Sequence, residues 1–84
     1  MDRNQKTLEH ILMRRGDANV PFSDLCRLLT ALGFSERIRG DHHIFAMEGI
    51  EEILNLQPKV GKAKPYQVGQ VRRLLLQERL TLGE

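Results

Sequence analysis

The chain has 84 residues, of which 40% are hydrophobic, 29% are charged and 5% are aromatic. This length suits one domain, because either half would have too small a core to fold alone. One cysteine cannot form a disulfide within the chain, and no apolar run reaches the ~20 residues of a membrane-spanning helix. The composition and the absence of an apolar signal segment exclude disulfide-rich secreted and membrane-spanning proteins, and they predict a cytoplasmic protein.

The formal net charge is +2, but the charge is unevenly distributed. Residues 1–58 carry a net charge of −2, and residues 59–84 carry a net charge of +4. A basic C-terminal third suits contact with phosphates or with an acidic partner, although an ordinary solvated surface has the same composition.

A first helix is predicted over residues 5–15, where Leu8 and Ile11 lie at helical spacing. Asn4 is the expected N-cap and Gly16 the expected stop. Residues 1–20 are thereby expected to form an N-terminal extension to a core domain of residues 21–80. This helix would either cover apolar surface or provide a contact for a partner or a second copy.

A second helix is predicted over residues 23–32, with Ser23 as N-cap and Gly33 as a positive-φ stop. Its leucines recur at the spacing of one helical stripe, which predicts a face buried in the core. These residues are Leu25, Leu28, Leu29 and Leu32.

Three short strands follow, over residues 34–39, 42–47 and 50–56. Gly40-Asp41 and Glu48-Gly49 supply the connecting turns. The third segment would also suit a helix by propensity, but its length and the breakers beside it favour a strand.

Residues 57–64 are predicted to be a basic loop, and Pro65 suits the first turn of a helix over residues 66–80. Gly69 lies inside that helix, and close packing is the expected reason for it. The order α–α–β–β–β–α predicts an α+β domain with a three-stranded antiparallel sheet and helices on one face.

A histidine pair, His42 and His43, enters the second strand directly after Gly40 and Asp41. Histidine exchanges a proton near neutral pH, so it can remove the proton of an RNA 2′-hydroxyl and start cleavage without a metal. Neighbouring strand residues point to opposite faces, so His43 shares a face with Phe45 while His42 does not. On this pattern alone, a strand histidine is more often a structural residue than a catalytic one.

Residues 21–80, which are most of the chain, resemble the HicA (YcfA-like) toxins of HicA–HicB toxin–antitoxin systems. The resemblance rests on a helix that ends in Leu-Gly-Phe, a Gly-x-His-His-x-Phe strand, a basic loop and a closing helix. The corresponding segments are FSDLCRLLTALGF, RGDHHIF, LNLQPKVGKAK and PYQVGQVRRLLL.

The resemblance implies a small fold like that of double-stranded-RNA-binding domains and an mRNA interferase that cleaves transcripts. It also implies a HicB-like antitoxin as partner, with a possible oligomer formed together with it, and no cofactor. The family's functional histidine maps onto His43, with Gly40, Asp41 and His42 as supporting residues. The family usually has serine where this chain has Asp41, whose carboxylate would either hold a neighbouring imidazole or repel RNA phosphate.

Other residues have weaker claims to function. Lys59, Lys62 and Lys64 are predicted to hold RNA phosphates by charge. Tyr66 is expected to pack on the sheet, with stacking on a base as the alternative. Cys26 is expected to be a buried, inert thiol, and no Cys/His spacing predicts a metal site.

Two alternatives to a ribonuclease remain at this point. A non-catalytic RNA-binding module would share the fold and the basic segment, and the exchange of serine for Asp41 would mark its lost activity. A protein-interaction domain would not bind RNA at all. RNA binding without cleavage would indicate the first, and RNA mobility unchanged at low salt would indicate the second.

Overall fold

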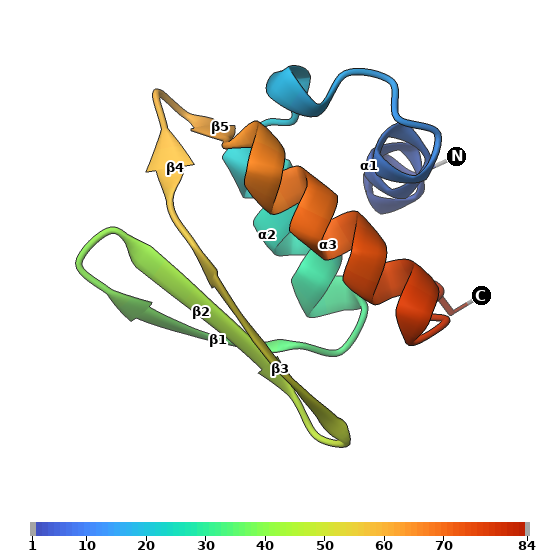
Figure 1. Cartoon of the computed structure of the whole chain (residues 1–84), viewed down its shortest axis with the longest axis vertical. Helices are drawn as coiled ribbons and strands as arrows, with labels where there is room; N and C mark the ends of the chain where they lie inside the picture. The colour runs from blue at the N-terminus through green and yellow to red at the C-terminus, as the bar shows by residue number, and fades with distance from the viewer. Residues whose placement is uncertain (1, 84) are drawn as a thin grey trace.

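The computed structural model describes residues 2–83. It confirms the predicted α+β domain, in which two N-terminal helices precede a three-stranded antiparallel sheet and a C-terminal helix. The elements are α1 (Arg3–Leu12), η1 (Asp17–Asn19), α2 (Phe22–Ala31), β1 (Ser35–Arg39), β2 (His42–Met47), β3 (Ile50–Leu56), β4 (Pro58–Lys59), β5 (Lys62–Ala63) and α3 (Pro65–Gln77), as labelled in Figure 1.

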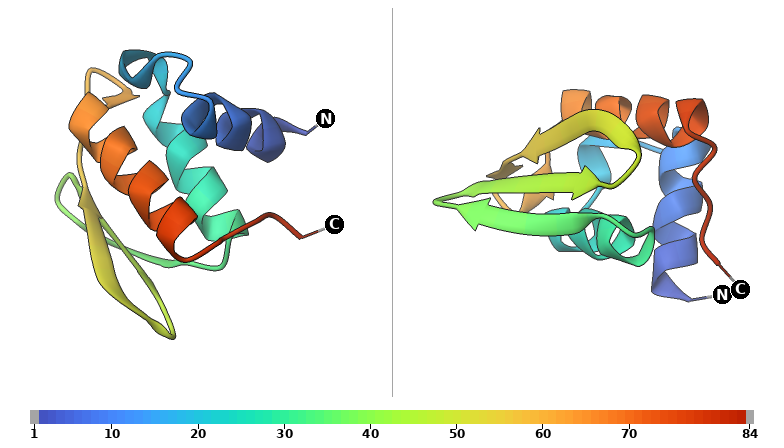
Figure 2. Two further views of the ribbon diagram at one scale, coloured as in Figure 1. Left: turned by 45° about the vertical axis from the view of Figure 1, so that its right-hand side comes forward. Right: turned by 90° about the horizontal axis from the view of Figure 1, so that it is seen from below.

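Helices α2 and α3 lie over one face of the sheet, and α1 packs against both helices on the side away from the sheet (Figures 1 and 2). One apolar cluster runs through all of these layers, from Leu8 and Ile11 of α1 to Phe45 and Leu54 of the sheet. The N-terminal helix therefore covers apolar surface of the domain. Within residues 2–83, no helix is both long enough and apolar enough to cross a membrane.

The first helix begins and ends earlier than its sequence predicts. Asp2, not Asn4, is its N-cap, and the Asp2 carboxylate accepts a hydrogen bond of 2.8 Å from the backbone N–H of Gln5. The helix ends at Leu12 because Arg14 adopts a left-handed conformation (φ 54°), so the chain turns before it reaches Gly16.

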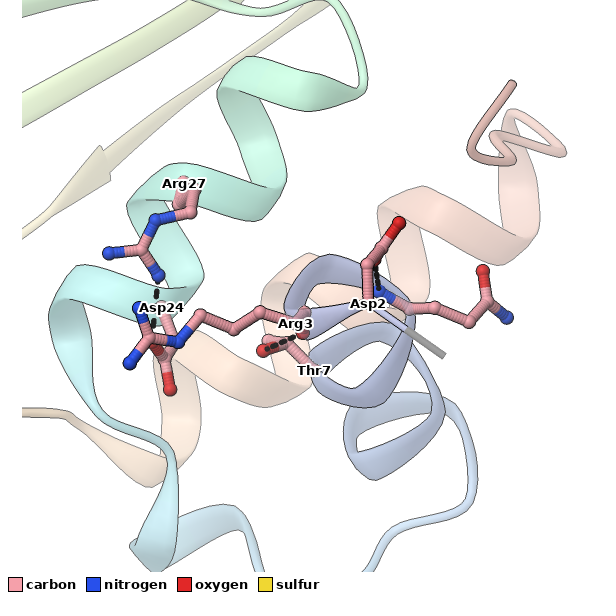
Figure 3. Close-up of polar contacts among 6 residues, drawn as sticks. Asp2, Arg3, Thr7, Asp24 and Arg27 are labelled. Carbon is pink, nitrogen blue, oxygen red and sulfur yellow. Dashed lines mark hydrogen bonds and ion pairs between the residues drawn. The ribbon is translucent and has the colours of Figure 1, made fainter. Parts of the chain in front are cut away.

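An ion pair between Arg3 and Asp24 joins α1 to α2, and hydrogen bonds within each helix lie beside it (Figure 3). Asp24 accepts a hydrogen bond of 2.9 Å from Arg27 on its own helix, and it lies 3.6 Å from Nε of Arg3 on α1. Thr7 donates to the Arg3 carbonyl at 3.1 Å. The two arginine side chains are exposed, so their ion pairs with Asp24 contribute little to stability.

The predicted Ser23 cap of α2 is wrong, since the helix begins at Phe22 and makes no side-chain cap hydrogen bond. Instead, the N–H of Phe22 donates to the carbonyl of Gly61 at 3.0 Å, so a distant backbone group takes the place of a cap. Gly33 has φ 111° and ends the helix region as predicted.

The sheet has the order β1-β2-β3 with antiparallel neighbours, and the third segment is a strand, as predicted. The inward face of β2 and β3 supplies the core residues Phe45, Leu54 and Leu56. The first strand begins at Ser35, one residue later than predicted, because the N–H of Phe34 donates to the Leu29 carbonyl of α2 at 3.0 Å and not to the sheet.

The predicted basic loop is a small hairpin. Strands β4 and β5 pair through Lys59 and Lys62, and Val60 and Gly61 form the turn with φ values of 52° and 77°. Strand β5 also pairs with the segment before α2, where the N–H of Ala63 donates to the carbonyl of Val20 at 2.9 Å. Each of these strands has two residues, which is too few to show an alternating pattern in the sequence.

The C-terminal helix begins at Pro65 as predicted, but it ends at Gln77 rather than at residue 80. The buried amide of Gln67, oriented to satisfy both groups, pairs with the N–H and the carbonyl of Gln57 at 3.1 Å each. The helix thereby anchors the link between β3 and β4, which positions the lysine-bearing hairpin.

Candidate functional site

His43 lies where the core meets solvent. Its partner across the ladder on one side, Leu56, is fully buried, whereas its partner on the other side, Ile38, is 61% exposed. The helices thus stop covering the sheet at this position. The His43 side chain is 21% exposed, so it is held by neighbours and still reached from outside.

A carboxylate that the sequence analysis missed holds the imidazole. Nδ1 of His43 lies 2.7 Å from Oε2 of Glu36, which is on the inward face of the neighbouring strand β1. An ionised carboxylate only accepts hydrogen bonds, so Nδ1 must be the donor. The proton of a neutral ring is then on Nδ1, and Nε2 carries the lone pair that can take a proton.

An aromatic edge fixes the plane of the same ring. The centroids of Phe22 and His43 are 4.8 Å apart, with an interplanar angle of 75°. Such an edge contact is favourable and limits rotation of the imidazole. The two rings form part of an open depression of about 510 Å³, which is lined by Phe22, Ser23, Cys26, Glu36, His43, Pro58 and Gly61.

Cys26 borders this depression and is half-buried, not fully buried as predicted. Burial, and next the negative charge of Glu36, raise the pKa of the thiol to about 12. The group is therefore protonated at neutral pH and is not present as a nucleophilic thiolate. Its Sγ nevertheless lies close to the site, since one ligand atom from each of Cys26, Glu36 and His43 falls within 4.8 Å of the others.

The structure places the other predicted supporting residues away from the His43 ring. His42 faces the outer side of the sheet, and its Nδ1 lies 3.0 Å from Oδ1 of Asn55. Asp41 lies 3.8 Å from Nε2 of His42 and accepts a hydrogen bond of 2.6 Å from Gln57. That hydrogen bond lowers the pKa of the Asp41 carboxyl.

Gly40 has φ 61° and serves the turn that precedes the pair. Its positive φ lets the chain make the tight turn between β1 and β2, and that turn sets the register that brings Glu36 to His43.

The three predicted lysines divide into two groups. Lys59 and Lys64 line a second depression of about 500 Å³ together with Tyr66, and this depression shares Pro58 with the one at His43. Lys62 instead lies 3.5 Å from Oδ1 of Asn19. Nζ of Lys64 donates to Gln57 at 3.2 Å, so Gln57 bridges Lys64 and Asp41.

Tyr66 does not pack on the sheet as expected, because the residue is 69% exposed. An exposed phenol ring beside two lysines is a suitable surface for a nucleic-acid base next to its phosphates. The two depressions share the lining residue Pro58; one holds the imidazole, and the other holds the two lysines and the aromatic ring.

Comparison with known proteins identifies no relative: no protein-family model, curated protein or solved structure matches the chain. The function is therefore inferred from the geometry of these two depressions together with the sequence resemblance.

Proposed function

We propose that the protein is a metal-independent endoribonuclease that cleaves mRNA, with His43 as the general base. The observation that carries this proposal is the short hydrogen bond from Nδ1 of His43 to Glu36, made at the edge of an open depression. It selects the tautomer whose Nε2 accepts a proton. The resemblance of residues 21–80 to the HicA toxins supports the same role for His43.

The chemistry needs few protein groups because RNA carries its own nucleophile. Nε2 of His43 takes the proton of a ribose 2′-hydroxyl, and the 2′-oxygen attacks the adjacent phosphorus. The bond to the 5′-oxygen breaks, and this oxygen takes a proton from solvent. The products are a 2′,3′-cyclic phosphate and a 5′-hydroxyl end, and Glu36 stabilises the imidazolium formed on the way.

The second depression binds the RNA strand beside the cleaved bond. Lys59 and Lys64 neutralise backbone phosphates, so affinity falls as salt rises. Tyr66 stacks on a base, which tolerates many sequences. The Asp41 carboxylate, linked to Lys64 through Gln57, reduces the positive charge at one edge of this surface without touching the catalytic ring.

An uncontrolled mRNA endoribonuclease would stop translation in its own cell. In keeping with the resemblance, the proposal includes a role as the toxin of a toxin–antitoxin pair, acting in the cytoplasm with a HicB-like protein as its inhibitor. Co-expression with an antitoxin-like protein encoded beside it would restore growth.

Replacement of the imidazole tests the proposal. Purified His43→Ala should cleave a labelled mRNA at least about 100-fold more slowly than wild type, because removal of a general base typically costs 10²- to 10⁴-fold. His42→Ala is the matched control, since it removes a neighbouring histidine from the opposite face and should keep the wild-type rate. Circular dichroism melting of both variants verifies that they fold.

The result that overturns the proposal is cleavage by His43→Ala at the wild-type rate, or loss of cleavage in both variants alike. A wild-type protein that binds RNA without cutting it would instead identify a non-catalytic RNA-binding module.

A further inference from the structure

Three side chains of different chemistry meet in the depression at His43. Cys26 comes from α2, Glu36 from β1 and His43 from β2, and their ligand atoms lie within 4.8 Å of one another. Thiolate, carboxylate and imidazole are the three protein ligands of zinc, and the sequence gives no sign of this set because its members are far apart in the chain.

We propose that this trio binds a Zn²⁺ ion and that the bound ion switches off RNA cleavage by occupying the general base. The binding half of this proposal stands on the geometry of the three side chains, and the inhibitory half rests on the proposed function.

The geometry needs only small movements to accept the ion. Two ligands on one tetrahedral zinc ion lie ~3.3–3.6 Å apart, given metal–ligand bonds of about 2.0–2.3 Å. The Glu36–His43 pair at 2.7 Å must therefore separate by roughly half an ångström, while Cys26 must close in. Side-chain rotation supplies both movements, since each ligand is partly exposed.

The surroundings fit a site with three protein ligands. The depression is open to solvent, so an ion can enter and a water molecule can complete its coordination. Phe22 and Pro58 supply apolar walls, which strengthen the electrostatic attraction of the ion to its ligands. Mg²⁺ and Ca²⁺ are not suited to this set, because they require oxygen ligands.

Zinc binding displaces a proton from Cys26 and prevents His43 from acting as a base. The Cys26 thiol releases its proton to solvent and coordinates as thiolate. If the ion takes Nδ1 of His43, the neutral ring carries its proton on Nε2, which becomes a donor. If the ion takes Nε2, it occupies that lone pair directly. In either mode, no lone pair remains on the imidazole to accept the 2′-hydroxyl proton.

Cobalt(II) is the probe for binding, because its coordination by thiolate gives a charge-transfer band in the near ultraviolet. Wild-type protein titrated with Co²⁺ should develop this band to saturation at one ion per chain, and Zn²⁺ should displace it. Cys26→Ser should lose the band and bind Zn²⁺ at least about 100-fold more weakly, since even residues that only support a ligand cost 10- to 100-fold.

Ser23→Ala is the matched control, because Ser23 lines the same depression on the same helix and offers no ligand in the trio. It should keep the cobalt band. A wild-type spectrum without a thiolate band, or an equal band in Cys26→Ser, overturns the site whether or not the protein cleaves RNA.

Cleavage assays test the inhibitory half. Zn²⁺ at saturation should slow wild-type cleavage at least about 100-fold, as expected for loss of a general base. Cys26→Ser should cleave at the wild-type rate without metal and should remain active at that Zn²⁺ concentration, and Mg²⁺ should inhibit neither protein. Equal inhibition of both proteins, or faster cleavage with Zn²⁺, overturns this half while leaving the cobalt result intact. Failure of the proposed function would show separately, as no cleavage by metal-free wild type.

Discussion

Two carboxylates, Asp17 and Glu36, each hold a nitrogen-bearing partner at almost the same distance, and both carboxylates are partly exposed. Oδ2 of Asp17 lies 2.8 Å from Nη2 of Arg72, and Oε2 of Glu36 lies 2.7 Å from Nδ1 of His43. Arg72 is a residue of the buried layer between helices, and it also donates to the Ile11 carbonyl at 3.0 Å.

The difference lies in what the partner can do after the bond is made. Every contact of Arg72 ties η1 and the end of α1 to α3, and a guanidinium does not release a proton. The imidazole of His43 keeps an unused nitrogen beside an open depression. A short contact to a carboxylate therefore has a structural role when its partner cannot exchange a proton, and it can have a catalytic role when its partner keeps a nitrogen that can. Four substitutions test this distinction.

The largest expected effect is on cleavage when the negative charge beside His43 is removed. Glu36→Gln should lower kcat for RNA cleavage by about 100-fold, because an amide can donate as well as accept and no longer fixes the ring tautomer. The KM for RNA and the melting temperature should change little. Glu51→Gln, an exposed glutamate of β3, is the control and should match wild type in steady-state kinetics.

The next largest effect should be a loss of stability, measured by urea unfolding, when Asp17 loses its partner Arg72. Arg72→Met should reduce the free energy of unfolding by about 2–3 kcal/mol, because it leaves Asp17 and the Ile11 carbonyl without their donor. Arg73→Met, at the neighbouring position with a side chain 65% exposed, should change it by less than about 0.5 kcal/mol. Equal losses in the two variants would contradict a structural role for the Asp17–Arg72 pair.

A smaller effect should be seen in acid. The hydrogen bonds from Arg72 are the main cause that lowers the pKa of the Asp17 carboxyl below its ordinary value of 3.8. A carboxyl with a lowered folded-state pKa stabilises the fold above its unfolded-state pKa, and this contribution disappears as the pH falls through the folded-state pKa. Stability measured between pH 5 and pH 2 should therefore decline less steeply in Asp17→Asn than in wild type.

The acid experiment has an internal control. In the Arg72→Met background, the Asp17→Asn substitution should leave the pH dependence nearly unchanged, because the cause of the lowered pKa is already gone. An unchanged slope difference in that background would show that a group other than Arg72 lowers the pKa of Asp17.

The smallest effect is expected at Gly69, beside the same arginine. A methyl group added there would lie 3.7 Å from Nη2 of Arg72, an ordinary contact, so close packing is not the reason for this glycine. Gly69→Ala should raise the free energy of unfolding by about 0.5–1 kcal/mol through helix propensity. A loss of stability in thermal melts would show that the methyl group displaces the arginine from Asp17.

The helices and the sheet could be predicted from the sequence because their signals are local. The leucine stripe, the turn glycines and the alternation in β2 and β3 are each complete within a few residues, and the structure confirms them. The exact ends of the helices are harder to predict from the sequence. The Phe22 start of α2 depends on a hydrogen bond to Gly61, and no local pattern can specify a partner that lies 39 positions away in the chain.

The site was predictable in part. Alternation along β2 correctly placed His43 on the face of Phe45 and His42 on the other. A two-residue turn at Gly40-Asp41 also fixes the register, which puts Glu36 diagonally across from His43, so the missed carboxylate had a signal. Cys26 had none, because the angle at which a helix lies on a sheet is set by the whole core.

Phe22 contacts two parts of the molecule that are far apart in the sequence, the β4–β5 hairpin and His43 of β2. Its backbone is fastened to the tip of the lysine-bearing hairpin, and its ring rests edge-on against the imidazole. Under the proposed function, RNA bound at the hairpin would therefore be connected to the support of the general base through this one phenylalanine, over a path far shorter than the chain between them.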